Sequence, residues 1–105
     1  MNTKIGKRKN NIRCIIFKEN GVWYGVALEL NIVEAADTPR EAMIFLLEAA
    51  SGYLEAAKEA KIEANQKIDP EYEKMWQSLN QENKKCDEVF FFGNLNLAQN
   101  DLVLA

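Results

Sequence analysis

The fold of this 105-residue chain is decided by residues 12–28, which read IRCIIFKENGVWYGVAL. Two runs within this stretch, 12–18 and 22–28, are rich in the β-branched and aromatic residues that are typical of strands. Asn20-Gly21 lies between them, and this pair most readily supplies the two positive-φ positions of a tight hairpin turn. We therefore predict a β-hairpin, followed by a third apolar run from Leu30 to Ala36.

A long amphipathic helix is predicted directly after these strands. Thr38 is placed as its N-cap, Pro39 as its first residue, and Glu41 where it can reach back to the Thr38 amide. Gly52 costs about 1 kcal/mol relative to alanine in mid-helix, so we expect a close backbone approach or a slight bend there. Apolar residues recur at the spacing of a buried stripe as far as about Lys61: Met43, Leu46, Leu47, Ala50, Leu54 and Ala57, with Phe45 and Tyr53 widening it.

Both faces of the first two strands are largely apolar. In the first strand, Ile12, Cys14 and Ile16 alternate with Arg13, Ile15 and Phe17. One helix cannot cover both faces, so we expect a partner chain or the C-terminal part of this chain to cover the other. After a linker at 63–68, Asp69-Pro70 repeats the cap-plus-proline start and opens a second amphipathic helix that ends near Asn83.

The C-terminal part contains an aromatic run, Val89-Phe90-Phe91-Phe92, that we predict to be a strand. A bare aromatic edge strand would aggregate. We therefore expect these four residues either to complete the sheet beside the first strand or to form oligomer contacts with a second copy. Gly93-Asn94 is expected to turn the chain into a weaker run, Leu95 to Ala98, before Leu102-Val103-Leu104.

Together these patterns predict an α+β fold, in which a small antiparallel sheet (a β-β-β-α core) packs on one long helix, with a C-terminal helix and strand extension. We divide the chain into a basic N-terminal arm at 1–11, the core at 12–62 and the extension at 63–105. The extension contains a helix at about 70–83, a strand at about 88–92 and a tail. This length corresponds to one domain.

The chain contains no histidine. This excludes Ser–His and Cys–His nucleophile pairs and the common zinc and haem ligand sets. Glu29, Glu34 and Asp37 are the carboxylates nearest the strand ends, but a two-metal site needs several carboxylates that converge on rigid strands. We expect these three to face water or a partner, and we expect no catalytic residue, cofactor or metal.

The two cysteines, Cys14 and Cys86, lie far apart and outside any CxxC pattern. We interpret them as reduced thiols of a cytoplasmic protein, with a Cys14–Cys86 bridge as the alternative. No apolar run approaches the ~20 residues that a membrane span needs, and the N-terminus has no apolar region of a secretory signal.

The formal net charge of −3 is unevenly distributed. Five basic residues with no acid among residues 1–13 leave −8 for the remainder: Lys4, Lys7, Arg8, Lys9 and Arg13. A basic arm can contact the phosphates of a nucleic acid, although no aromatic residues are interleaved with these charges. The alternative is a solvated terminus.

The region from Ile12 to Ala60 resembles the HicB-like antitoxin family. The matching segments are the hairpin residues 20–27, the segment 28–33, and residues 37–42 leading into a helix that ends Tyr53-Leu54-Glu55. Glu29-Leu30 stands where the family has an E-L pair closing the second strand, and Thr38-x-x-Glu41-Ala42 stands at the motif that opens the helix. Many members have Pro-Glu-Leu-Pro-Gly where this chain has residues 28–32, and a glycine before the threonine where it has Ala36-Asp37.

The resemblance implies a partial RNase H-type core and a protein that is not an enzyme. Such proteins commonly neutralise a small mRNA-cleaving, HicA-type toxin by covering its active surface, so the implied partner is a small basic protein. Many also carry a C-terminal helix-turn-helix or ribbon-helix-helix segment that binds operator DNA. The C-terminal part of this chain resembles neither, because a helix precedes its aromatic strand and few basic residues accompany that helix.

We expect partner contacts at Trp23, Tyr24, Glu29, Glu34 and Asp37. Trp23 lies beside the small residues Gly25 and Ala27, which would leave its ring open as a binding anchor; alternatively it packs on Trp76 or Phe90. Two other functions stay open. One is a free-standing homo-oligomeric interaction module, a dimer or larger, without a toxin partner, and the other is a nucleic-acid-binding regulator that uses the basic arm.

Overall fold

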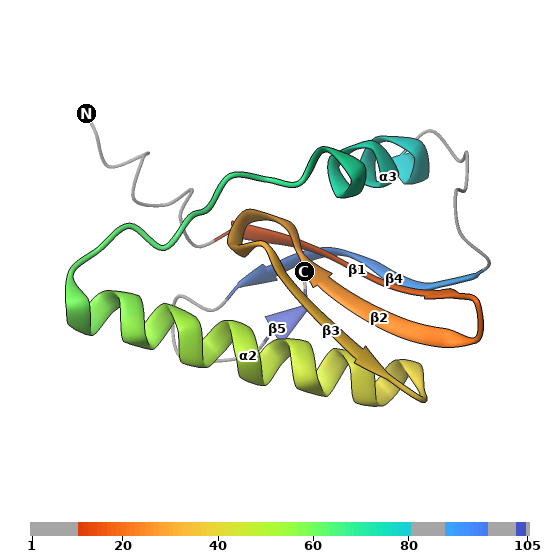
Figure 1. Ribbon diagram of the computed structural model, residues 1–105, viewed down its shortest axis with the longest axis horizontal. Coiled ribbons are helices and arrows are strands. Elements are labelled where there is room, and N and C mark those ends of the chain that lie inside the picture. Colours follow the sequence, from red (N-terminus) through yellow and green to blue (C-terminus); the bar gives the residue numbers. More distant parts are fainter. Residues whose placement is uncertain (1–10, 81–87, 97–102, 105) are drawn as a thin grey trace.

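The computed structural model describes residues 11–80, 88–96 and 103–104 (Figure 1). These residues form one antiparallel sheet in the strand order β3-β2-β1-β4-β5. This is the α+β fold predicted from the sequence, with a helix on each side of the sheet. In chain order the elements are β1 (Asn11–Glu19), β2 (Val22–Ala27), the 3-10 turn η1 (Leu28–Leu30), β3 (Ile32–Ala36), α2 (Pro39–Ala60), α3 (Pro70–Asn80), β4 (Glu88–Asn96) and β5 (Val103–Leu104).

The sheet is buried on both faces by the chain's own helices. Figure 1 shows it nearly edge-on, with α2 beneath and α3 above. Ile12, Cys14 and Ile16 of β1 share a core with the inner side of α2, whereas the alternating Ile15 and Phe17 share one with Met75 and Leu79 of α3. The second cover that the sequence requires is therefore supplied by the C-terminal extension.

The hairpin between β1 and β2 has the predicted turn. Asn20 and Gly21 both have positive φ, at 54° and 82°. Glu19 pairs with Val22, so these two residues alone form the connection. Such a turn matches the right-handed twist of the strands that it joins.

The third strand begins later than the apolar pattern predicts. Leu28–Leu30 leave the sheet as a 3-10 turn, which ends at Asn31 in the left-handed conformation, and β3 starts at Ile32. The turn places Leu28 in the core between the sheet and α3, and Leu30 in the core between the sheet and α2. Burial of these two leucines on opposite faces explains why the chain leaves the strand pattern here.

The start of α2 is nearly as predicted. The Thr38 hydroxyl accepts a hydrogen bond from the Glu41 amide at 3.1 Å and donates to the Glu41 carboxylate at 3.3 Å. The carboxylate thus contacts the Thr38 side chain, where the sequence suggested the Thr38 amide. Ala42, Leu46, Ala50 and Ala57 form the buried stripe, and Phe45, expected to widen it, is exposed instead.

The closest approach of α2 to the sheet is at Gly25 of β2. A Cβ atom there would lie 2.9 Å from the carbonyl oxygen of Ala42 and 3.2 Å from the side chains of Ile16 and Leu46. Gly52, where a close approach was expected, has nothing within 4 Å of its Cβ position. The expected close approach is therefore absent, and the slight bend expected as its alternative stays a prediction. The glycine that the packing requires is on the strand beneath the helix, and not within the helix.

The aromatic strand completes the sheet beside β1, which confirms the first of the two expectations for this run. β4 pairs antiparallel with β1 from Glu88 to Asn96 and runs through Gly93-Asn94 without turning, which corrects the predicted end at Phe92. A bulge leaves Phe90 as an extra residue between the pairs Ile16–Phe91 and Phe17–Val89. The helix end expected near Asn83, the run at 97–98, Leu102, Cys86 and the arm up to residue 10 lie outside the described residues.

No helix in the described part of the chain is long and apolar enough to cross a membrane.

Gly25 and Gly52 provide a matched test of this packing. We expect Gly25→Ala to lower the free energy of unfolding by about 1–3 kcal/mol, because the new methyl group overpacks the contact with α2. Gly52→Ala should raise it by about 0.5–1 kcal/mol, because the helix gains a better helix former in open space. Urea unfolding monitored by circular dichroism measures both, and equal effects of the two substitutions would contradict this account.

Candidate functional site

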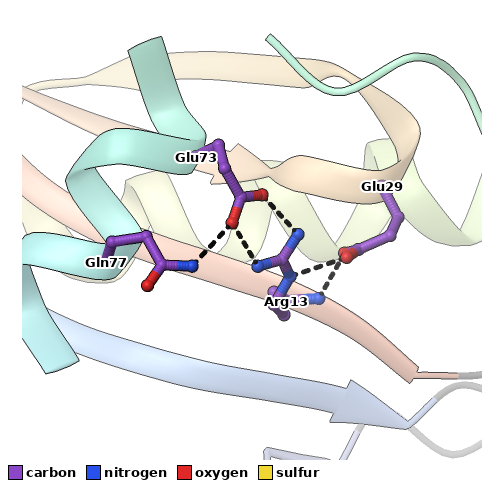
Figure 2. Close-up of polar contacts among 4 residues, drawn as sticks. All are labelled: Arg13, Glu29, Glu73 and Gln77. Atoms are coloured by element: carbon purple, nitrogen blue, oxygen red, sulfur yellow. Dashed lines mark hydrogen bonds and ion pairs between the residues drawn. The ribbon is translucent and has the colours of Figure 1, made fainter. Parts of the chain in front are cut away.

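A cluster of charged side chains joins the sheet to α3. The guanidinium of Arg13 on β1 lies between two carboxylates, from Glu29 on η1 and Glu73 on α3 (Figure 2). Its Nε donates to Glu29 at 2.7 Å, and its two terminal nitrogens donate to the two oxygens of Glu73 at 2.8 and 3.2 Å. Gln77, one turn further along α3, donates to the same carboxylate at 3.0 Å.

Glu29 also replaces a strand partner that β1 lacks at this point. The last pair between β1 and β2 is Cys14–Ala27, after which the chain turns into η1. The Glu29 carboxylate accepts the backbone N–H of Arg13 at 2.8 Å. Its own backbone carbonyl accepts the N–H of Gln66 at 2.7 Å, which holds the linker between α2 and α3. Glu29 therefore fixes the end of the sheet where the chain passes from one face to the other.

Aromatic rings extend this cluster toward β4. The guanidinium carbon of Arg13 lies 5.4 Å from the ring centroid of Trp76, within the range of a cation–π contact. The Trp76 ring in turn meets Phe92 edge-on at 5.6 Å. Side chains from β1, η1, α3 and β4 are thus joined in one contiguous set of contacts.

The electrostatics of the cluster stabilise its charged form. The hydrogen bond from Arg13 lowers the pKa of the Glu73 carboxyl, and that from Gln77 lowers it further. The same hydrogen bond, more than that with Glu29, raises the pKa of Arg13 against the opposing effect of burial. The ion pair is therefore intact over the whole neutral range of pH.

Two residues that the sequence assigned to different partners contact each other in this cluster. Arg13 was expected to join a phosphate-binding arm and Glu29 to face a protein partner. In the structure each neutralises the other, and the guanidinium of Arg13 has both of its donor edges occupied. The other four basic residues assigned to the arm, Lys4, Lys7, Arg8 and Lys9, lie outside the described residues.

Trp23 and Tyr24 lie on opposite faces of β2. Trp23 is only 8% exposed and meets Phe90 edge-on at 6.3 Å, with the Lys18 ammonium 6.0 Å from its ring centroid. Of the two roles weighed for Trp23, packing against Phe90 is the one that the structure shows. Tyr24 is half-buried and stacks on Phe17 at 5.5 Å. α2 fills the space over Gly25, so this glycine does not leave the Trp23 ring open.

Glu34 and Asp37 lie apart from the Arg13 cluster. Glu34 is in the middle of β3, the edge strand, and Asp37 is exposed in the bend before α2. Among the described residues, no three cysteine or carboxylate side chains are placed to hold a metal ion together. The geometry therefore assigns these two carboxylates to a surface.

That surface also contains apolar side chains that the sequence reasoning missed. Ile44 and Phe45 on α2 are 48% and 41% exposed. Val33 on β3 is also exposed, but it pairs with Val26 and therefore lies on the α3 side of the sheet. The sequence could have indicated that Ile44 is exposed, because this residue lies off the buried stripe of α2. We call the following residues of β3, the bend after it and the first turns of α2 the β3–α2 surface: Glu34, Asp37, Arg40, Glu41, Ile44, Phe45 and Glu48. Four acids and one base give it a net charge of −3.

Cys14 is an unreactive thiol in this fold. It is free and buried beneath α2, and burial raises its pKa to about 12. Since the thiolate is the nucleophilic form, this side chain is inert at neutral pH. Cys14 therefore contributes to the packing of the core between the sheet and α2.

No family model, curated protein or solved structure matches the chain.

Removal of the Glu29 side chain tests the double role assigned to it. We expect Glu29→Ala to lower the free energy of unfolding by about 1–3 kcal/mol, because it leaves the backbone N–H and the Nε of Arg13 without an acceptor. Glu48→Ala, on the exposed face of α2, is the matched control and should change stability by less than about 0.5 kcal/mol. Similar losses for both variants in urea unfolding would refute the assignment.

Stability at low pH tests the Arg13–Glu73 pair. The Glu73 carboxyl has a lower pKa in the folded chain than its ordinary value of 4.5, so its contribution is fully present above that value. The contribution is lost as the pH falls through the folded pKa. We expect the urea midpoint of Glu73→Gln to fall less steeply with acidification than that of the unaltered chain, and parallel curves would contradict the pairing.

Proposed function

We propose that this chain is an antitoxin-type binding protein, HicB-like in residues 12–60, that neutralises a small basic mRNA-cleaving toxin by covering its active surface. The observation that carries the proposal is the β3–α2 surface, which combines half-exposed Ile44 and Phe45 with a net charge of −3. Apolar side chains within a polar rim are typical of protein–protein recognition.

The proposed mechanism is stoichiometric occlusion. An enzyme that cleaves RNA binds a polyanion through basic residues, and the carboxylates of Asp37, Glu41 and Glu48 are suited to the same residues. These charges would raise the association rate and exclude unsuitable partners. Ile44 and Phe45 would supply affinity by burying apolar area. The antitoxin would thus compete with RNA without chemistry of its own.

The Arg13 cluster supports this role by making the binding surface rigid. It fixes η1, from which β3 begins, and β3 leads directly into Thr38 and the start of α2. A surface that is ordered before binding loses less conformational entropy when it meets its partner. The cluster lies on the α3 side of the sheet, so a toxin on the β3–α2 surface need not displace it.

The experiment is co-expression with the product of a short neighbouring reading frame that encodes a basic, histidine-containing protein. We expect a one-to-one complex in pull-down and rescue of growth from the toxin. The double variant Asp37→Lys/Glu48→Lys should weaken the complex at least about tenfold, because two attractive contacts become repulsive.

Glu71→Lys is the control for that variant, because it reverses an exposed charge on α3, away from the β3–α2 surface. It should leave binding and rescue unchanged. The proposal fails if the intact chain neither binds nor rescues, and the assigned surface is wrong if both sets of variants weaken the complex equally. Binding of the isolated chain to RNA or DNA, lost on deletion of residues 1–10, would instead favour the nucleic-acid regulator.

A further inference from the structure

The outer edge of β4 is only partly covered within the described residues. On its inner side β4 pairs with β1 from Glu88 to Asn96. On its outer side β5 pairs with Leu95 and Asn96 alone. No described strand therefore lies beside residues 89–94, and an open sheet edge is a template for pairing with another chain.

Two phenylalanines on this stretch are exposed on opposite faces of the sheet. Phe90 is 50% exposed and meets Trp23 on the α2 side, whereas Phe92 is 38% exposed and meets Trp76 on the α3 side. Each ring rests on a tryptophan of its own chain and presents its remaining area to solvent. Exposed apolar area next to an open strand edge is typical of an interaction surface.

The charge pattern points to a second copy of this chain as the occupant. Residues 89–100 are twelve consecutive uncharged residues, the longest such run in a chain whose net charge is −3. Two copies of an acidic protein repel each other elsewhere on their surfaces. At this edge no like charges would be opposed.

We propose that two copies pair β4 with β4 antiparallel, about a two-fold axis at Phe92. Each Phe92 would then lie opposite Phe92 of the other copy. Each Phe91 would lie opposite Gly93 of the other copy, where its aromatic ring covers the strand glycine. This register pairs only residues 90–94 of the two copies, which lie within the stretch that β5 leaves open. The bulge residue Phe90 would face Asn94 of the other copy, the last residue before β5 begins.

The two-fold arrangement closes on itself, whereas pairing of β4 with the β3 edge of another copy would continue without limit. It also leaves the β3–α2 surface free, because β3 and β4 lie toward opposite edges of the sheet. The dimer does not depend on the proposed antitoxin function. If both hold, one dimer presents two toxin-binding surfaces facing away from each other.

The test is sedimentation velocity on the full chain from about 2 to about 200 µM, a range suited to the weak pairing that a short edge gives. We expect the mass to rise from the 12.0 kDa of one chain toward twice that value. Phe92→Lys should weaken the dimer at least about tenfold by placing two ammonium groups together. Val33→Lys, on the opposite edge strand, is the matched control and should dimerise normally.

Hydrogen exchange of the unaltered chain keeps the test independent of any folding defect in the variant. Amides of residues 89–94 should exchange more slowly at the high concentration, while those of β3 should not change. A monomer at every concentration overturns the proposal, as does concentration-independent exchange at 89–94. Loss of association in Val33→Lys together with protection of β3 would also overturn it, in favour of head-to-tail assembly.

Discussion

The rest of this structure depends on a sheet whose two faces must both be buried. Adjacent residues of β1, Ile15 and Ile16, are fully buried on opposite faces. One helix can cover only one of these faces, so the chain has to pass from one side of the sheet to the other between α2 and α3. The linker does this at the end of the sheet next to η1, where Gln66 bonds to the Glu29 carbonyl.

Arg13 fixes the geometry of that crossing. It connects β1, η1 and α3 through groups that remain partly exposed to water, so each ion pair contributes only modest stability. Its larger effect is positional, since planar guanidinium pairing constrains both the distance and the direction of the partners. The apolar contacts of Met75 and Leu79 hold α3 on the sheet, and the Arg13–Glu73 pair sets where along the sheet it lies.

Covering both faces leaves the edges of the sheet and the outer side of α2 as the places where the proposed partners would bind. At one edge, β3 and the first turns of α2 combine carboxylates with Ile44 and Phe45, which suits a basic partner. At the other, β4 presents Phe90 and Phe92 without charge, which suits a second copy. The charged residues and the uncharged run lie toward opposite ends of the strand order. The two proposed contacts therefore differ in chemistry and do not compete.

The sequence by itself determined the features that act over a few residues: the Asn20-Gly21 turn, the Thr38 and Asp69 caps, the buried stripe of α2 and the need for a second cover on the sheet. Only the tertiary structure decided the rest. It paired Arg13 with Glu73, sixty positions away, buried Trp23 under Phe90, extended β4 through Gly93 and placed α2 over Gly25. Local signals are readable because neighbours in sequence stay neighbours in space, whereas these four outcomes depend on where both helices lie on the sheet.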